Sequence, residues 1–175
     1  MLTGLTVRER TEADIAACVE ALRGVYAADR YPMRWPADAA AFVTARDVLA
    51  AWVARREGAV VGHVVLRSGA GHDDAAMWSA ATGLPDSGHG LIARLFVVPE
   101  ERGTGLGRQL LDIAVAESWH RALWPVLDVM AANTAAVALY ERLGWRRVGG
   151  REFPFSDGST APMYCYVAPP DPSLR

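Results

Sequence analysis

Three glycines alternate with other residues in the segment Arg102-Gly103-Thr104-Gly105-Leu106-Gly107, and apolar residues at helical spacing follow it. Glycines let successive backbone N–H groups turn toward one point without a Cβ in the way. The start of a helix adds partial positive charge, so such a turn can hold a pyrophosphate through its main chain alone. Arg102 and Arg108 could add charge at its edge. The segment therefore suggests binding of a phosphorylated ligand, and a glycine-rich turn that binds nothing is the alternative.

Two other phosphate-binding motifs differ from this turn. A Walker loop ends in Gly-Lys-Ser/Thr, whereas here Gly105 is followed by Leu106-Gly107-Arg108. The dinucleotide fingerprint needs its third glycine one position later and an acidic residue at the end of the next strand, whereas Asp128 lies inside its expected strand. Fewer than half of the residues follow the turn. The sequence therefore favours neither a nucleotide triphosphatase nor a dinucleotide-binding enzyme.

Alternating and continuous apolar runs, bounded by glycine and proline, predict the elements that position this turn. The expected strands are Leu5–Glu9, Ala51–Arg56, Ala59–Leu66, Leu91–Val98, Val126–Met130, Trp145–Val148 and Pro162–Val167. Helical spacing and capping residues predict the helices, which are Thr11–Asp29, one beginning near residues 37–39, Asp74–Thr82, one behind Gly107, and one capped by Asn133 and ended by Gly144. This order indicates one mixed α/β sheet.

The length of 175 residues suits one domain. We expect this domain to span residues 1–168, with an inserted lobe at about 68–90 and a loose tail at 169–175. Charged residues make up 22% and the formal net charge is −2, with no long run of one sign, so nothing points to nucleic acid.

The sequence shows neither an apolar signal core nor an apolar segment long enough to span a bilayer, so we expect a cytoplasmic protein with no membrane association. Cys18 and Cys165 are expected to be two buried reduced thiols rather than a disulfide, because no export signal accompanies them.

The glycine turn resembles the coenzyme A motif of the GNAT superfamily, R/Q-x-x-G-x-G/A, with a strand and a helix on the expected sides. Asn133 and Tyr140, followed by Leu143-Gly144-Trp145, look like the next helix and strand of that family. The resemblance covers most of the chain and is poorest at 68–90 and in the tail. It implies the GNAT fold, a single, mostly antiparallel mixed sheet flanked by helices. It also implies acetyl transfer from acetyl-CoA to an amine by direct attack in a ternary complex.

The same resemblance assigns roles to individual residues. Coenzyme A would lie along Phe96, Val97 and Val98, where a backbone N–H meets the thioester carbonyl. The cofactor-binding residues would be Phe96, Val97, Val98, Arg102, Gly103, Thr104, Gly105, Leu106, Gly107, Arg108, Asn133 and Tyr140. Tyr140 would stand beside the sulfur, and a phenol, protonated at neutral pH, can donate to the leaving thiolate. On general grounds a tyrosine on an apolar helix face packs in the core more often.

The general base has no assigned residue. Many members of the resembled family carry a glutamate on the central strand, but Leu91–Leu95 offers no carboxylate. The candidates are His89, Asp128, Asp157 or a chain of water molecules. His63 is expected to be structural.

His72, Asp73 and Asp74 form a polar cluster, which we interpret as solvated surface rather than a metal site. No metal is expected.

The acceptor is expected to be the primary amine of a small molecule or peptide. Tyr31, Arg34 and Trp35 lie in a loop bracketed by prolines and could bind a planar or anionic part of it, or pack the loop. Trp78 could close the pocket that binds the acceptor, or it could anchor the inserted lobe. A non-catalytic acyl-CoA-binding sensor is the alternative function, since the strand carboxylate is missing. The resemblance also suggests a homodimer, since dimers are common among similar proteins, although the sequence defines no interface.

Overall fold

The computed structural model describes residues 4–171 and divides the chain into two compact units. The first unit holds the chain up to residue 67 together with 92–117, and the second holds 68–91 and the chain from residue 118 onward. Strand β4 (His89–Val97) and helix α4 (Leu106–His120) each contribute residues to both units. The expectation of one domain with an inserted lobe stays a prediction.

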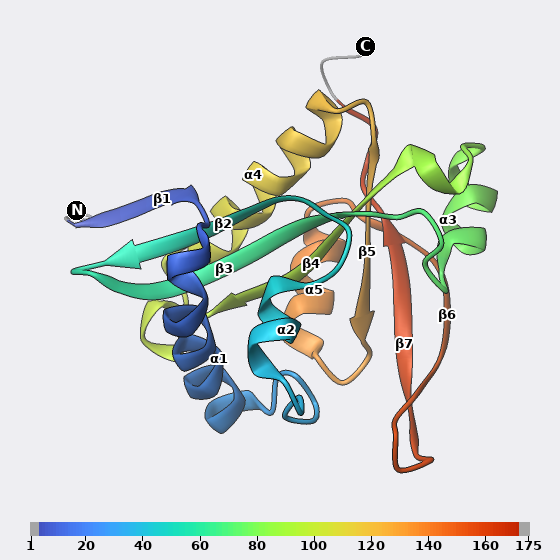
Figure 1. Ribbon diagram of the computed structural model, residues 1–175. Coiled ribbons are helices and arrows are strands. Elements are labelled where there is room, and N and C mark those ends of the chain that lie inside the picture. Colours follow the sequence, from blue (N-terminus) through green and yellow to red (C-terminus); the bar gives the residue numbers. More distant parts are fainter. Residues whose placement is uncertain (1–3, 172–175) are drawn as a thin grey trace. The chain divides into compact units, whose positions relative to one another are not determined.

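Three antiparallel strands lead the first unit, β1 (Leu5–Glu9), β2 (Val48–Arg56) and β3 (Ala59–Ser68) (Figure 1). Glu57 and Gly58 join β2 to β3, and both have positive φ, 50° and 88°. Two such residues form the turn whose twist matches an antiparallel hairpin. The hairpin expected from Glu57-Gly58 is therefore confirmed.

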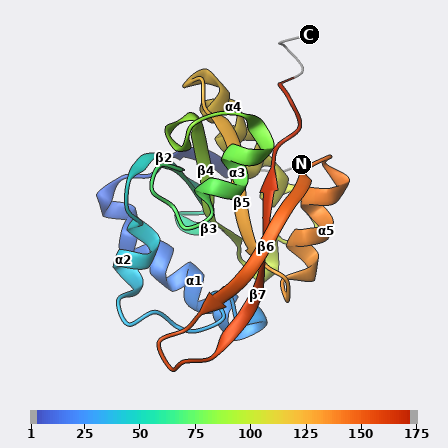
Figure 2. The ribbon, with the colours of Figure 1, turned by 90° about the vertical axis from the view of Figure 1, so that its right-hand side faces the viewer.

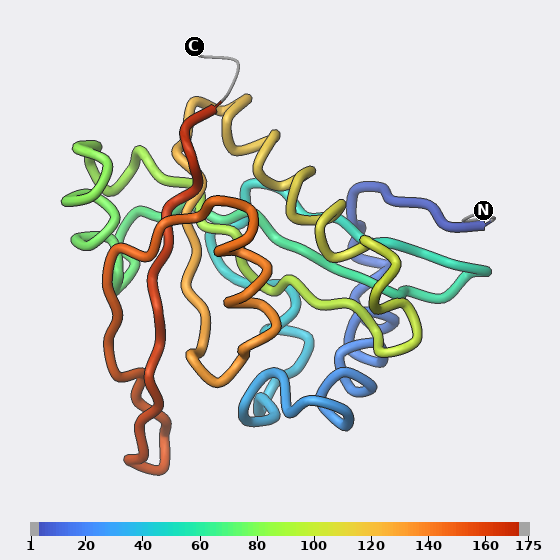
Figure 3. The backbone as a smooth tube through the Cα atoms, turned by 180° about the vertical axis from the view of Figure 1, so that it is seen from behind, coloured from blue at the N-terminus to red at the C-terminus, as the bar shows by residue number. Residues whose placement is uncertain are grey.

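Helices cover both faces of these strands. Helices α1 (Ile15–Asp29) and α2 (Ala39–Thr44) lie on one face and α4 on the other, as Figures 1 and 3 show from opposite sides. On the α1 face a buried cluster joins Cys18 and Leu22 of α1 to Val53 and Phe96. On the other face a Cβ at Gly62 would lie 2.8 Å from Cδ1 of Leu110, so α4 packs closely on β3.

The second unit contains β5 (Trp124–Met130), β6 (Arg146–Pro154) and β7 (Thr160–Val167). The first residues of β4 pair in parallel with β5, whereas β5 with β7 and β7 with β6 are antiparallel. The strand order is β1-β2-β3-β4-β5-β7-β6. The mixed, mostly antiparallel sheet with flanking helices is thus confirmed.

Helices α3 (Ala75–Thr82) and α5 (Thr134–Arg142) lie on opposite sides of β5, β6 and β7 (Figure 2). Tyr140 of α5 contacts Tyr166 of β7, with ring centroids 6.1 Å apart. Met77 of α3 approaches Gly149, which pairs with Cys165. Since neighbouring strand residues point to opposite faces, Tyr166 and Cys165 mark the α5 and α3 sides of this sheet.

One expected strand was too short. The strand expected to end at Val148 continues as β6 to Pro154, because Gly149 and Gly150 pair with Cys165 and Tyr164 instead of ending the strand. A register shift between Arg147 and Gly149 accommodates the glycine pair.

Both cysteines are free and buried, as expected. Burial raises the pKa of the Cys18 thiol to about 11 and that of Cys165 to about 12, so neither is poised as a thiolate. Within residues 4–171, none of the helices has the length and apolar character that crossing a membrane requires. The cytoplasmic location stays a prediction.

Candidate active site

The glycine turn adopts the backbone that its sequence predicts. Gly103 and Gly105 have φ of 74° and 86°, a region that residues with a Cβ rarely occupy. No described atom lies within 4 Å of an ideal Cβ at either glycine, so conformation and not crowding requires glycine there. Helix α4 begins directly at Leu106. The first N–H groups of a helix have no partner inside it, so the turn offers main-chain donors to an anion.

Ion pairs and a hydroxyl anchor this turn inside the first unit. Arg56 Nη2 donates to Glu101 Oε2 at 2.9 Å, and this hydrogen bond holds the pKa of the Glu101 carboxyl below its usual range. The Thr104 hydroxyl donates to the Glu101 carbonyl at 2.7 Å. Arg102 Nη1 donates to Asp29 Oδ1 at the end of α1, at 3.0 Å. The charge of Arg102 is therefore shared with a carboxylate.

Arg108, which follows the glycine turn, is exposed on α4, and its Nε lies 3.4 Å from Asp112 Oδ2. Both predicted cations thus have acidic neighbours, and the backbone carries most of the anion-binding character of the turn.

The side chains of the predicted thioester strand are committed to packing. Phe96 is buried in the α1 cluster and stacks on His63 with ring centroids 5.1 Å apart. Val97 approaches Gly107, and the Val98 N–H donates to the Val61 carbonyl at 3.0 Å. Among the three predicted residues, the N–H of Val98 is therefore already used inside the unit.

Arg94 interrupts the apolar run of β4, and its side chain reaches Phe42 of α2. Its φ is 53°, its Nε donates to the Phe42 carbonyl at 3.1 Å, and its guanidinium covers the Phe42 ring. A non-glycine residue with positive φ inside a strand is unusual.

His63 holds this irregular peptide and is structural, as expected. Its Nδ1 lies 2.9 Å from the Arg94 carbonyl, and its Nε2 lies 2.9 Å from Arg10 Nη1. Since the carbonyl can only accept and the guanidinium only donate, Nδ1 carries the proton. Burial lowers the pKa of His63 to about 4, so the ring is neutral at physiological pH.

The predicted acceptor loop is partly packed into the core. Tyr31 lies near Phe96, with centroids 6.4 Å apart, and both Tyr31 and Trp35 contact the buried α1 cluster. The Trp35 ring also lies 5.3 Å from Tyr26 and 4.9 Å from the Arg23 guanidinium. Arg34 is exposed. The aromatic residues thus anchor the loop, and Arg34 is the member presented to solvent.

In the second unit, Asn133 caps α5 as predicted, with its Oδ1 accepting from the Ala136 N–H at 3.4 Å. Tyr140 is 7% exposed and lies against Trp145 and Tyr166. The neighbouring Tyr166 hydroxyl donates to Glu141 Oε1 at 3.0 Å. Tyr140 therefore lies on the inner face of α5, where its ring packs against Trp145 and Tyr166. This packing is compatible with a further role for its hydroxyl. The glycine turn belongs to the first unit and Tyr140 to the second.

Two of the candidate bases have structural roles. His89 is buried, and its Nε2 lies 2.8 Å from the hydroxyl of Thr82, the last residue of α3. Asp157 lies in the exposed β6–β7 turn, where it accepts from the Ser159 N–H at 2.9 Å. Trp78 of α3 is fully buried, and its ring packs against His72 and His89.

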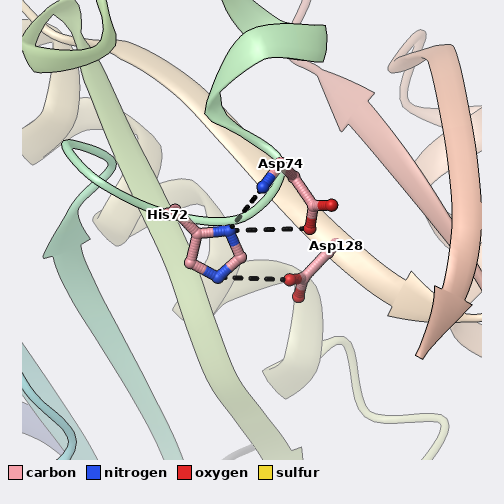
Figure 4. Close-up of side chains that lie close together, drawn as sticks. All are labelled: His72, Asp74 and Asp128. Carbon is pink, nitrogen blue, oxygen red and sulfur yellow. Dashed lines mark hydrogen bonds and ion pairs between the residues drawn. The ribbon is translucent and has the colours of Figure 1, made fainter. Parts of the chain in front are cut away.

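The third candidate, Asp128, lies on the α3 side of β5, since it pairs with Cys165. His72 Nε2 lies 3.6 Å from Asp128 Oδ2, and His72 Nδ1 lies 3.5 Å from Asp74 Oδ2. Figure 4 shows the imidazole between the two carboxylates, each facing a different ring nitrogen. We call His72, Asp74 and Asp128 the His72 cluster.

The interpretation of residues 72–74 as solvated surface was wrong for Asp74. Asp74 is fully buried and its Oδ1 accepts from Arg151 of β6. Asp73 does point to solvent, with 82% of its side chain exposed. Asp74 stands directly before α3 but makes no side-chain cap hydrogen bond there, so no local signal in the sequence indicated its burial.

The chain belongs to the acetyltransferase (GNAT) family, because the model of that family matches residues 17–145, well over half of the 175 residues. The resemblance inferred from the sequence is thereby confirmed.

Among individual relatives, the chain is 46% identical over 74 residues to mycothiol acetyltransferase of Thermobispora bispora, covering 40% of this chain and 25% of the relative. It is 39% identical over 72 residues to the ribosomal protein bS18-alanine N-acetyltransferase of Escherichia coli, covering 38% and 47%. The chain thus matches less than half the length of these curated relatives.

Solved structures agree on the fold. The ribosomal-protein-S18-alanine N-acetyltransferase of Escherichia coli has a TM-score of 0.67 at 20% identity, covering 94% of this chain and 93% of that one. Arabidopsis thaliana NAA60 in complex with acetyl-CoA has a TM-score of 0.67 at 22% identity, covering 93% and 97%. At such identities the likeness concerns the fold alone.

Proposed function

We propose that this chain transfers an acetyl group from acetyl-CoA to a primary amine of a small molecule or peptide, by direct attack in a ternary complex. The observation that carries the proposal is the glycine turn of this GNAT-family chain, in which Gly103 and Gly105 have positive φ immediately before α4. Main-chain donors at a helix start suit the pyrophosphate of coenzyme A.

Acetyl-CoA, as the acyl donor, supplies a thioester carbonyl and a thiol leaving group. In the proposal, the turn from Arg102 to Gly107 holds the phosphates, while Asn133 adds a hydrogen bond. A backbone N–H of Phe96 or Val97 polarises the thioester carbonyl, since the N–H of Val98 already donates to Val61. Tyr140 donates the proton that the departing sulfur needs.

The acceptor class rests on the relatives, whose names point to two kinds of acceptor. One relative is named mycothiol acetyltransferase, and the other is named for N-acetylation of an alanine of ribosomal protein bS18. We propose a primary amine of either kind for this chain, and we propose that Arg34, which is exposed, contacts an anionic part of the acceptor.

The test is a release of free thiol from acetyl-CoA in the presence of a panel of amines, including small aliphatic amines and peptides with an N-terminal alanine. Amine-dependent thiol release with a matching N-acetylated product in mass spectrometry supports the proposal. Tight binding of acetyl-CoA by calorimetry without turnover on any amine would favour the acyl-CoA sensor instead.

A further inference from the structure

Two contacts with the neighbouring strand β3 hold β4 inside the first unit, and they enclose the segment 95–97, which carries the main-chain donors proposed for the thioester carbonyl. At one end, the Arg94 carbonyl lies 2.9 Å from His63 Nδ1. At the other end, the Val98 N–H donates to the Val61 carbonyl at 3.0 Å. The second contact uses a main-chain group that every residue has. Only the first depends on a particular side chain, that of His63.

The contact with His63 falls on a strained residue. Arg94 has φ of 53°, which costs free energy in a residue with a Cβ. Such a conformation persists only where neighbouring groups hold it, and strained residues of this kind gather at functional sites. Besides the His63 contact, the Arg94 Nε donates to the Phe42 carbonyl at 3.1 Å and its guanidinium lies 3.8 Å from the centroid of the Phe42 ring. The strain therefore lies directly before the segment 95–97.

The His63 ring is itself fixed on several sides. Its Nε2 lies 2.9 Å from Arg10 Nη1, which also donates to the Val43 carbonyl at 2.7 Å. That carbonyl belongs to the last turn of α2, where carbonyls have no partner inside the helix. One face of the ring stacks on Phe96, with centroids 5.1 Å apart and an interplanar angle of 24°. His63 thus holds β4 at two places, on either side of residue 95.

His63 does not take a proton from a ligand. It is fully buried, its Nδ1 carries the proton, and its Nε2 accepts from Arg10. Burial lowers its pKa to about 4, and the nearby guanidinium groups of Arg10 and Arg94 also disfavour a positive charge on the ring. Any effect of His63 on chemistry must therefore act through β4.

We propose that His63 is a positioning residue for acetyl transfer, which fixes the N–H groups of Phe96 and Val97 in the orientation that polarises the thioester carbonyl. The inference rests on the proposed acetyl transfer and names the side chain that sets the geometry of its main-chain donors. A hydrogen bond weakens steeply when its angle changes. A rotated peptide at 95–97 would therefore stabilise the developing oxyanion less, while the phosphate contacts in the glycine turn would remain.

His63→Asn and His63→Gln separate this role from packing, because both remove the ring and each keeps one polar contact. The Asn amide N–H takes the place of Nδ1 and can donate to the Arg94 carbonyl. The Gln amide reaches the place of Nε2, near Arg10, and leaves that carbonyl without its donor. His63→Gln should lower kcat by about 10²-fold, the scale for displacing a positioned group by about 1 Å. His63→Asn should keep kcat within about fivefold of the wild type, and KM for acetyl-CoA should change by less than about threefold in both.

Val61→Ala is the matched control on the same strand. It removes a buried side chain but keeps the main-chain carbonyl that holds Val98. This variant should melt at a lower temperature with kcat nearly unchanged. Equal kcat in His63→Asn and His63→Gln, or a loss of kcat that simply follows the melting temperature across all three variants, would show that His63 only stabilises the fold.

Infrared spectroscopy gives a readout that does not depend on turnover. Acetyl-CoA labelled with ¹³C at the thioester carbonyl has a stretching band whose frequency falls when an N–H polarises the carbonyl. We expect a lower frequency in the wild-type complex than in free acetyl-CoA, and a smaller decrease in the saturated His63→Gln complex. An equal decrease in both complexes would overturn the positioning role alone. No decrease in the wild-type complex would refute the proposed N–H contact as well.

A third measurement needs no variant, so it decides even where the His63 variants fail to fold. Nitrogen-15 NMR of the wild-type protein at pH 7 should show a neutral His63 with its proton on Nδ1. A proton on Nε2 would remove the donor to the Arg94 carbonyl and overturn the proposal.

Discussion

The glycine turn and the His72 cluster differ in how they are built. The turn is one continuous segment, and its glycines determine its backbone conformation, since Gly103 and Gly105 both have positive φ. The His72 cluster combines a loop before α3 with a residue of β5, and Arg151 of β6 supports it. The comparison teaches that a site made from main chain is visible in sequence order, whereas a site made from side chains depends on strand pairing.

The largest expected effect tests the backbone site. Gly105→Asp should abolish acetyl-CoA binding in calorimetry, because φ of 86° strains a residue with a Cβ and the new carboxylate repels phosphate. Gly58→Asp is the matched control, since φ is 88° there and the hairpin turn lies outside the motif. Unchanged affinity in a folded Gly105→Asp protein would contradict the placement of the pyrophosphate.

The next effect tests whether a side chain of the second unit takes part in chemistry. Tyr140→Phe keeps the ring against Trp145 and should lower kcat by roughly 10²-fold or more, with little change in stability or acetyl-CoA binding. Tyr166→Phe is the control. It loses the hydrogen bond to Glu141 and should cost about 1 kcal/mol of stability with kcat nearly intact. The opposite pattern would make Tyr140 a core residue.

A third prediction concerns His63, the histidine that supports β4 and contrasts with His72. Burial lowers its pKa to about 4 in the folded chain, so the neutral ring stabilises the fold fully above the unfolded pKa of about 6.5. As pH falls from there toward 4, the unfolded chain takes up the proton first, and the free energy of unfolding should decrease by about 3 kcal/mol.

Urea unfolding at several pH values measures this slope. His63→Gln should be less stable at pH 7 and should lack this part of the pH dependence, whereas His120→Gln at an exposed position should retain it. The same slope in both variants would show that His63 does not cause it.

The smallest expected effect separates exposed from packed residues in the acceptor loop. Arg34→Ala should raise the KM of an anionic acceptor several-fold, with little change in acetyl-CoA affinity or melting temperature. Trp35→Ala should also lower stability, because the ring packs on the α1 cluster and under Arg23. Equal weakening of acetyl-CoA binding by both changes would show that this loop does not serve the acceptor.

Local signals account for most of the predicted fold. Thr11 and Asp14 form the capping box before α1, Glu57-Gly58 forms the hairpin turn, and Gly83 ends α3 in the left-handed conformation. The end of β6 was predicted wrongly because that prediction also relied on a local signal. Gly149-Gly150 resembles a strand end locally, but pairing with β7 carries the strand through both glycines.

The sequence by itself determined the glycine turn, the cap at Asn133 and the place of Tyr140 on the apolar face of α5, because each depends on residues within one helical turn of another. Only the tertiary structure decided that Asp74 is buried and that His72 lies between Asp74 and Asp128. Asp128 follows His72 by more than fifty residues, and which face of β5 it occupies depends on its pairing with Cys165. A shift of that pairing by one residue would turn Asp128 to the α5 side, so no local pattern could specify the cluster.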